Sequence, residues 1–197
     1  MNTVVNLRDF RDRGRGLPTL LLIDLHHDAP GAAESGQSAF LPEAVANCRA
    51  VLRHARACGI PVAFTRQVTP PANMLATPVY PRWIAGIEPD RWDMVFDRQR
   101  PSCYASAEFR EAAQEIGGNY VIAGRFGELS CLSTVIDAFH RDHRPTVLVD
   151  ALMCSAQDEM PSAAMLRAVT CILSHYADTV HTHPWIRATS RRVGAIK

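Results

Sequence analysis

The stretch Thr19–Leu25 reads TLLLIDL, an apolar run interrupted only by Asp24. Such a run is too short for a typical helix and predicts a strand that is buried on both faces. Further strands are predicted at residues 61–65, 120–123, 146–149 and 179–182. Between the strands, helical spacing of apolar residues marks residues 42–59, 108–116, 129–140 and 158–176. The alternation predicts one α/β domain whose parallel sheet is covered on both faces.

Residues 68–101 interrupt this alternation. They are rich in Pro, Trp, Met and Asp and follow no clean period. We expect a long excursion that contains short helices. An excursion of that length in a compact domain is usually functional.

The bulk composition limits the class of partner. The chain has 197 residues, of which 47% are hydrophobic and 21% charged, as in a globular domain with an apolar core. A formal net charge of +1 favours neither nucleic acid nor a membrane as partner. The start has no secretion-signal pattern, so we expect a cytoplasmic protein. We divide the chain into an N-terminal extension, residues 1–17, and a single domain, residues 18–197.

Three residues fall where predicted parallel strands end. They are Asp24, Gln67 and Gly124. Ligands of open α/β sheets bind beyond the carboxyl ends of the strands, so we expect these residues to share one edge of the sheet.

Four segments resemble the isochorismatase-like hydrolase family. They read LLLIDLHHD (residues 20–28), IPVAFTRQ (60–67), VFDRQRPSCYAS (95–106) and VIAGRFGELSCLSTVIDAFHRDHRPTVLVDAL (121–152). The resemblance is nearest to the branch that acts on isochorismate and aminodeoxyisochorismate. It implies a Rossmann-like α/β fold with a six-stranded parallel sheet and helices on both faces.

The resemblance also implies a set of site residues. Asp24 occupies the position of the family's catalytic aspartate, Arg98 that of its lysine, and Ser130 that of its cysteine nucleophile. A cis peptide bond is implied near Arg125-Phe126. The substrate-binding candidates are His26, Gln67, Trp83, Tyr104, Arg125 and Phe126. Cys131 is one residue out of register with the family cysteine.

These departures leave three functions open. A family amidase uses a thiol nucleophile, whereas a serine hydroxyl normally needs a histidine base, which His26 or His27 would have to supply. Ether hydrolysis needs no nucleophile: an acid protonates the methylene carbon of an enolpyruvyl ether, and water captures the oxocarbenium ion. The acid there would be Asp24, in a protonated form. The third possibility is a non-catalytic or repurposed member of the family.

Arg98 has two possible roles in this scheme. It could set the protonation of Asp24, or it could bind a substrate carboxylate through two parallel hydrogen bonds. We expect no cofactor and no metal, because the six cysteines form no CxxC pair. The expected partners are a small carboxylated metabolite of a biosynthetic pathway and further copies of the chain, in a homodimer or homotetramer.

Overall fold

The computed structural model describes residues 17–27, 41–68, 80–157 and 160–196, with side chains described as far as residue 190. Its centre is a six-stranded sheet in the order β3-β2-β1-β4-β5-β6, and every pair of neighbours is parallel. The strands are β1 (Thr19–Ile23), β2 (Val62–Gln67), β3 (Met94–Arg98), β4 (Tyr120–Arg125), β5 (Thr146–Met153) and β6 (Asp178–Val180). The predicted six-stranded parallel α/β fold is confirmed.

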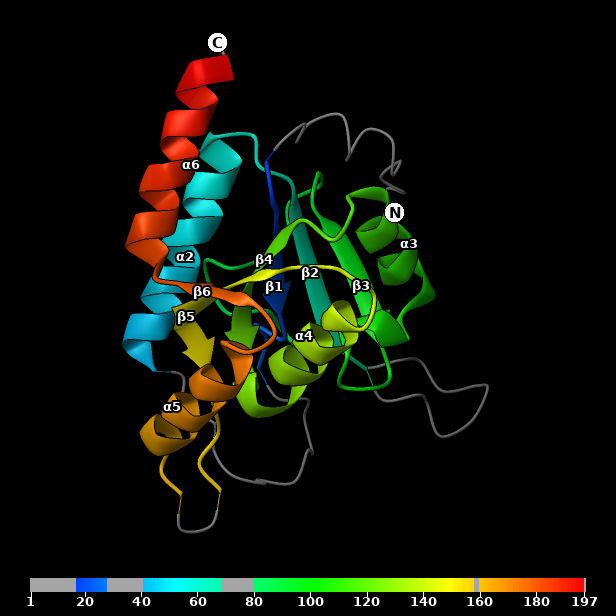
Figure 1. The fold of residues 1–197 in the computed structure, drawn as a ribbon, viewed down its shortest axis with the longest axis vertical. Helices are drawn as coiled ribbons and strands as arrows, with labels where there is room; N and C mark the ends of the chain where they lie inside the picture. The colour runs from blue at the N-terminus through cyan, green and yellow to red at the C-terminus, as the bar shows by residue number, and fades with distance from the viewer. Residues whose placement is uncertain (1–16, 28–40, 69–79, 158–159, 197) are drawn as a thin grey trace.

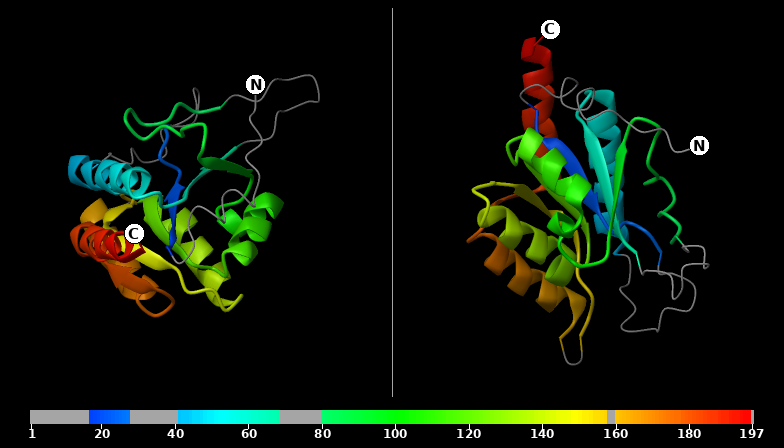
Figure 2. Two further views of the ribbon diagram at one scale, coloured as in Figure 1. Left: turned by 90° about the horizontal axis from the view of Figure 1, so that it is seen from above. Right: turned by 90° about the vertical axis from the view of Figure 1, so that its right-hand side faces the viewer.

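Helices cover both faces of this sheet (Figures 1 and 2). They are α2 (Pro42–Ala57), α3 (Ala107–Glu115), α4 (Leu132–Phe139), α5 (Ser162–Leu173) and α6 (Thr182–Ile196). Helices α2 and α6 lie side by side and pack on one face, in a core that contains Leu52 and Trp185. Helices α3, α4 and α5 pack on the other face, around Phe109, Val135 and Leu173.

Two elements differ from the sequence prediction. The excursion that was expected to hold short helices contains β3 instead, and within it residues 69–79 lie outside the described part. The chain after β6 forms α6, where the sequence analysis predicted no helix. Asp150 of β5 stabilises the start of α6, because its Oδ1 accepts the Thr182 N–H and the Thr182 hydroxyl, both at 2.8 Å.

The order of the strands reverses between β1 and β4. From β1 the chain proceeds through β2 to β3 on one side, and then returns to the other side of β1 to form β4, β5 and β6. In open parallel sheets this reversal creates the crevice where ligands bind. In the described part of the chain, no helix has the length and apolar character that crossing a bilayer demands.

Candidate active site

Asp24 lies directly after β1, at the point where the strand order reverses. Its backbone is left-handed, with φ 53°, a conformation that aspartate adopts more readily than most residues with a Cβ. Its N–H donates to the Thr65 carbonyl at 3.0 Å. The side chain is 1% exposed, and its Oδ1 accepts the backbone N–H of Gln67 at 3.0 Å. The turn therefore buries an acid at the carboxyl edge of the sheet.

Arg98, the last residue of β3, is the cation that pairs with this acid. Its side chain is fully buried, and Nη2 donates to Asp24 Oδ2 at 2.5 Å. Nη1 donates to Gln67 Oε1 at 3.3 Å and to the Arg100 carbonyl at 2.9 Å. These bonds direct the guanidinium toward the protein. Of the two roles considered for Arg98, the geometry therefore favours fixing Asp24 over binding substrate.

The ionisation of Asp24 follows from these neighbours. Burial raises the pKa of Asp24, but the His26 imidazole, the Arg98 guanidinium and the Ser130 hydroxyl lower it by more in total, and the net pKa falls below its usual range. His26 Nε2 is 3.6 Å from Oδ1, beyond an ordinary hydrogen bond, so we regard Arg98 as the principal stabilising partner. Asp24 is therefore a carboxylate at neutral pH. The expectation that it is a protonated acid is not supported.

Ser130 and Cys131 point in different directions. Both lie in the turn of π-helix over Gly127–Cys131 that follows β4. The Ser130 hydroxyl is buried, affects the pKa of Asp24, and has no hydrogen-bond partner among the described residues. The Cys131 thiol instead donates to the Arg125 carbonyl at 3.5 Å and packs in the core beneath α4. Burial and the nearby charge of Asp24 raise the pKa of Cys131 well above its usual range, so this thiol stays protonated.

The turn between β4 and Ser130 contains a left-handed residue where a cis bond was expected. No peptide bond among the described residues is cis, and Phe126 has φ 55°. The change of chain direction is therefore taken up by φ rotation at Phe126. Gly124 lies beside β1 here, and a Cβ on it would come 2.3 Å from the Ile23 carbonyl oxygen. Only glycine allows the two strands to approach this closely.

Four predicted substrate-binding residues lie in contact around the loop after β1. The backbones of His26 and Trp83 form an antiparallel bridge, and their rings meet edge to face at 6.0 Å. Arg125 is buried, and its Nη1 donates to the His26 carbonyl at 3.0 Å. Its guanidinium lies 4.4 Å from the centre of the Phe126 ring. The loop after β1 is thus fixed at His26 by the backbone of Trp83 and by the guanidinium of Arg125.

Tyr104, another predicted substrate-binding residue, lies elsewhere. Its hydroxyl is hydrogen-bonded to the Tyr120 hydroxyl at 2.8 Å and to His143 Nδ1 at 2.7 Å. Tyr120 is the first residue of β4, at the opposite end of that strand from Gly124. Burial raises the pKa of Tyr104 to about 12. The Tyr104 hydroxyl is therefore buried and satisfied by Tyr120 and His143, and the structure does not bring it together with Asp24.

Three further buried residues lie near Arg98 and were not predicted: Thr65, Cys103 and Thr134. The Cys103 thiol lies 3.4 Å from the Thr65 hydroxyl, and the Cys103 N–H donates to Thr134 Oγ1 at 2.9 Å. Burial raises the pKa of Cys103, and the charge of Arg98 partly offsets this rise. Thr65 directly follows the apolar part of β2, but neither Cys103 nor Thr134 carries a pattern that distinguishes it from a core residue.

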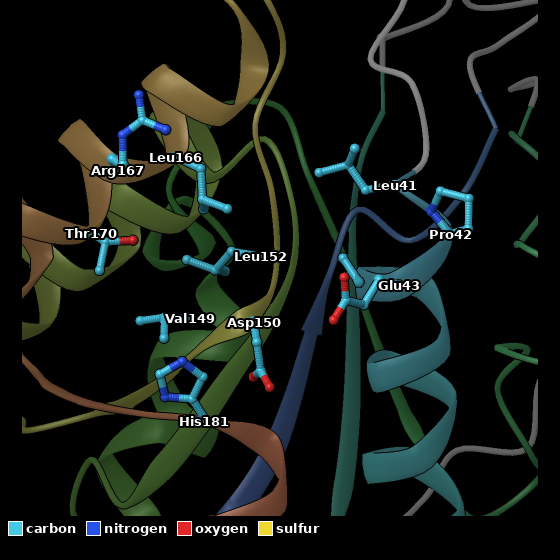
Figure 3. Close-up of a pocket in the computed structure, with 11 residues that line it drawn as sticks. Leu41, Pro42, Glu43, Val149, Asp150, Leu152, Leu166, Arg167, Thr170 and His181 are labelled. Carbon is cyan, nitrogen blue, oxygen red and sulfur yellow. The ribbon is translucent and has the colours of Figure 1, made fainter.

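A separate hollow of about 640 Å³ opens between α2 and α5 (Figure 3). Its charged side chains belong to Glu43, Asp150, Arg167 and His181. Asp150 is engaged at the start of α6, and the other three are exposed. The hollow shares no residue with the Asp24 site, and none of the buried unpartnered polar atoms lies in it. The Asp24 site therefore remains the candidate site. No group of three His, Cys, Asp or Glu side chains in the described residues is arranged to hold a metal ion.

Comparison with known proteins identifies the family. A model of the isochorismatase domain matches residues 18–181. The chain belongs to the isochorismatase family. Enterobactin synthase component B of Escherichia coli is 25% identical over 133 residues, or 60% of this chain. That alignment covers 47% of the relative, so the chain spans about half the length of the curated proteins it matches.

Solved structures of the isochorismatase family share the fold. A family member from Chromobacterium violaceum superimposes with a TM-score of 0.75 at 20% identity, over 88% of this chain and 94% of that one. A cysteine hydrolase from Pseudomonas syringae gives 0.74 at 17% identity, over 88% and 93%. Because identities this low establish the fold alone, the choice of substrate depends on the residues around Asp24.

Proposed function

We propose that this isochorismatase-family protein hydrolyses a small carboxylated enol ether, or a closely related metabolite, without a cysteine nucleophile. The observation that carries the proposal is the environment of Asp24. One side of its carboxylate is held by Arg98, and the buried Ser130 hydroxyl and His26 Nε2 next to it have no hydrogen-bond partner in the described chain. A buried polar group without a partner costs about 1–3 kcal/mol. Such groups in a crevice are explained most simply by a small polar ligand or water that they bind.

Ether hydrolysis fits these residues better than thiol chemistry does. It requires a proton for the methylene carbon of the substrate and a water molecule for the oxocarbenium ion. Asp24 is ionised and can take a proton from that water, as a general base. Ser130 occupies the position of the family nucleophile with a small side chain, while the Cys131 thiol is bonded to a carbonyl in the core.

A serine-dependent amidase is the second candidate. The observation in its favour is that the Ser130 hydroxyl lies beside a carboxylate and has no other partner in the described residues. A serine hydroxyl is a weak acid that normally needs a histidine base, itself oriented by a third group. A non-catalytic role is the third possibility, and substrate assays distinguish all three.

The test is incubation with isochorismate, aminodeoxyisochorismate and simple amides. Pyruvate release identifies the ether hydrolase and ammonia release from an amide identifies the amidase. Ser130→Ala should leave an ether hydrolase within about tenfold of wild type and abolish an amidase. Asp24→Asn should abolish both reactions. Because it also leaves the buried Arg98 without its counter-charge, we expect a lower stability, and circular dichroism at the assay temperature checks that the variant is folded. If none of these compounds is consumed, the proposal is wrong.

We propose further that the protein acts in a biosynthetic pathway of the cytoplasm, as a homodimer or homotetramer. The support is the family resemblance, including a curated relative whose name places it in enterobactin synthesis. Light scattering after size-exclusion chromatography measures the assembly, and a monomer at micromolar concentration contradicts that part of the proposal.

A further inference from the structure

We propose that His26, and not Asp24, protonates the substrate carbon in this site, while Asp24 takes the proton of the attacking water and passes it to the leaving oxygen. The inference rests on the proposed ether hydrolysis, and it assigns the proton that goes to carbon and the proton that comes from water to two different residues. It is carried by the orientation of the His26 ring and by the charges that surround it.

The ring of His26 is fixed in one orientation. Its Nδ1 lies 2.9 Å from the His27 carbonyl oxygen. A carbonyl oxygen can only accept a hydrogen bond, so Nδ1 carries a hydrogen in either protonation state of the ring. The backbone bridge to Trp83 and the edge-to-face contact of the two rings hold this orientation. Any proton that His26 gains or loses is therefore on Nε2.

Nε2 faces the reaction centre. It is 3.6 Å from Asp24 Oδ1, it is buried, and no described residue forms a hydrogen bond with it. When the ring is neutral, Nε2 directs a lone pair toward a carboxylate. When the ring is protonated, it directs an N–H into the same space. A substrate atom beside Asp24 would therefore lie within reach of this hydrogen.

The charges around His26 allow the proton to leave. Asp24 faces the ring, and Arg125 donates to the His26 carbonyl from β4. Arg66, on β2, lies 5.4 Å from the centre of the Trp83 ring. Arg98 is bonded to the other oxygen of Asp24. The negative charge of Asp24 is therefore shared with Arg98, and Asp24 does not form an isolated ion pair with the His26 ring. Histidine is also the side chain whose charge most readily changes near neutral pH.

The steps balance without an added co-reactant. The His26 Nε2–H bond breaks as the substrate's carbon–carbon double bond takes the proton to form a methyl group, which leaves an oxocarbenium ion and a neutral imidazole. Water adds to the cationic carbon and gives one proton to Asp24. The adduct is a neutral hemiketal. The ether bond then breaks: the leaving oxygen takes the proton from Asp24, and the hemiketal hydroxyl returns its proton to Nε2. The products are an alcohol and a 2-oxo acid, and both side chains regain their starting charges.

The experiment measures pyruvate release from isochorismate between pH 5 and 9. If a protonated general acid donates to the substrate, the wild-type rate should fall toward alkaline pH. His26→Gln keeps a polar side chain that can donate a hydrogen bond to the His27 carbonyl but cannot donate an acidic proton. It should lower kcat by about 10²–10⁴-fold and remove the alkaline decline. His175→Gln changes an exposed histidine outside the site and should behave as wild type.

Three results would overturn the assignment. The first is a His26→Gln protein, folded by circular dichroism, that keeps the wild-type pH profile with kcat within threefold. The second is nuclear magnetic resonance of the ring nitrogens that shows neutral His26 with its hydrogen on Nε2. If His26→Gln does not fold, His26→Asn, whose amide can still donate to the His27 carbonyl, replaces it under the same criteria. The third is that the wild-type protein releases no pyruvate from any enol ether. That result refutes the proposed function itself, whereas the first two refute only the role of His26.

Discussion

Replacing Arg98 with methionine removes the guanidinium from Asp24 but keeps most of the side-chain volume. Both side chains of the pair are almost completely buried, at 0% and 1% exposed, so the variant leaves a carboxylate in the interior without its cation. Removing one partner of such a pair costs about 3–5 kcal/mol. The variant also leaves Gln67 Oε1 and the Arg100 carbonyl without this donor, so we expect the upper half of that range at pH 7.

The destabilisation should depend on pH in a defined direction. In wild type the pKa of Asp24 is lowered in the folded state. Its ionisation therefore stabilises the fold above the pKa of the unfolded chain, about 3.9, and this stabilisation is lost as the pH falls through the folded value. In the variant the lowering effect of Arg98 is gone, so the pKa of Asp24 rises relative to wild type and less of this stabilisation is present at neutral pH. The two proteins should differ less at pH 4 than at pH 7.

Urea denaturation at both pH values measures this difference. The matched control is Arg66→Met, which breaks the ion pair between Arg66 Nε and Asp97 Oδ1 at 2.6 Å. Asp97 is 35% exposed, so water screens this pair and we expect a loss of no more than about 1 kcal/mol. A loss below 1 kcal/mol for Arg98→Met, or one that is equal at both pH values, would refute the view that Arg98 keeps Asp24 ionised.

Three further predictions concern other parts of the site and the core. Iodoacetamide should modify the exposed Cys171 and leave hydrolysis within twofold of the untreated protein, because Cys131 is buried. Loss of activity in proportion to the thiols modified would show that a thiol takes part in the reaction. Gly124→Ala should cost about 1–3 kcal/mol in urea denaturation, since the added Cβ meets the Ile23 carbonyl oxygen at 2.3 Å, and an unchanged midpoint would contradict the close strand approach. Tyr104→Phe should destabilise the fold by about 1–3 kcal/mol, because it leaves two buried hydrogen-bond partners unsatisfied. It should keep KM within twofold, and a large change in KM would indicate that Tyr104 contacts the substrate.

The central strands could be predicted because each has a local apolar signal. In β1 all five residues are buried, and the sequence shows five apolar or β-favouring residues in a row. In β3, Met94–Arg98, the edge position leaves Val95 exposed and admits Asp97, so the sequence lacks both a continuous run and a clean alternation. Helix α6 was missed because the acid that satisfies its first N–H is Asp150, distant in the sequence.

The positions of the site residues could be taken from family resemblance, but their chemical state could not. Resemblance supplied Asp24, Arg98 and Ser130, which the fold brings to one edge of the sheet. The direction of the Asp24 pKa depends on a sum of burial and three neighbours, and a sequence does not give the balance between them. Nor does the sequence give the direction of the Tyr104 side chain: its neighbour Cys103 contacts Thr65 and Thr134, whereas the Tyr104 hydroxyl is bonded to Tyr120 and His143.

The left-handed backbone at Asp24 restricts which substitutions report on chemistry alone. An alanine there would remove the carboxylate and also strain the turn, because a left-handed residue with an ordinary side chain costs about 1–2 kcal/mol. Asparagine tolerates this φ and keeps a side-chain oxygen that can accept the Gln67 N–H. In a saturation library, a folding screen should therefore retain aspartate first and, among its replacements, asparagine and glycine, while an activity screen should retain aspartate alone. Variants that pass the folding screen and fail the activity screen report on catalysis.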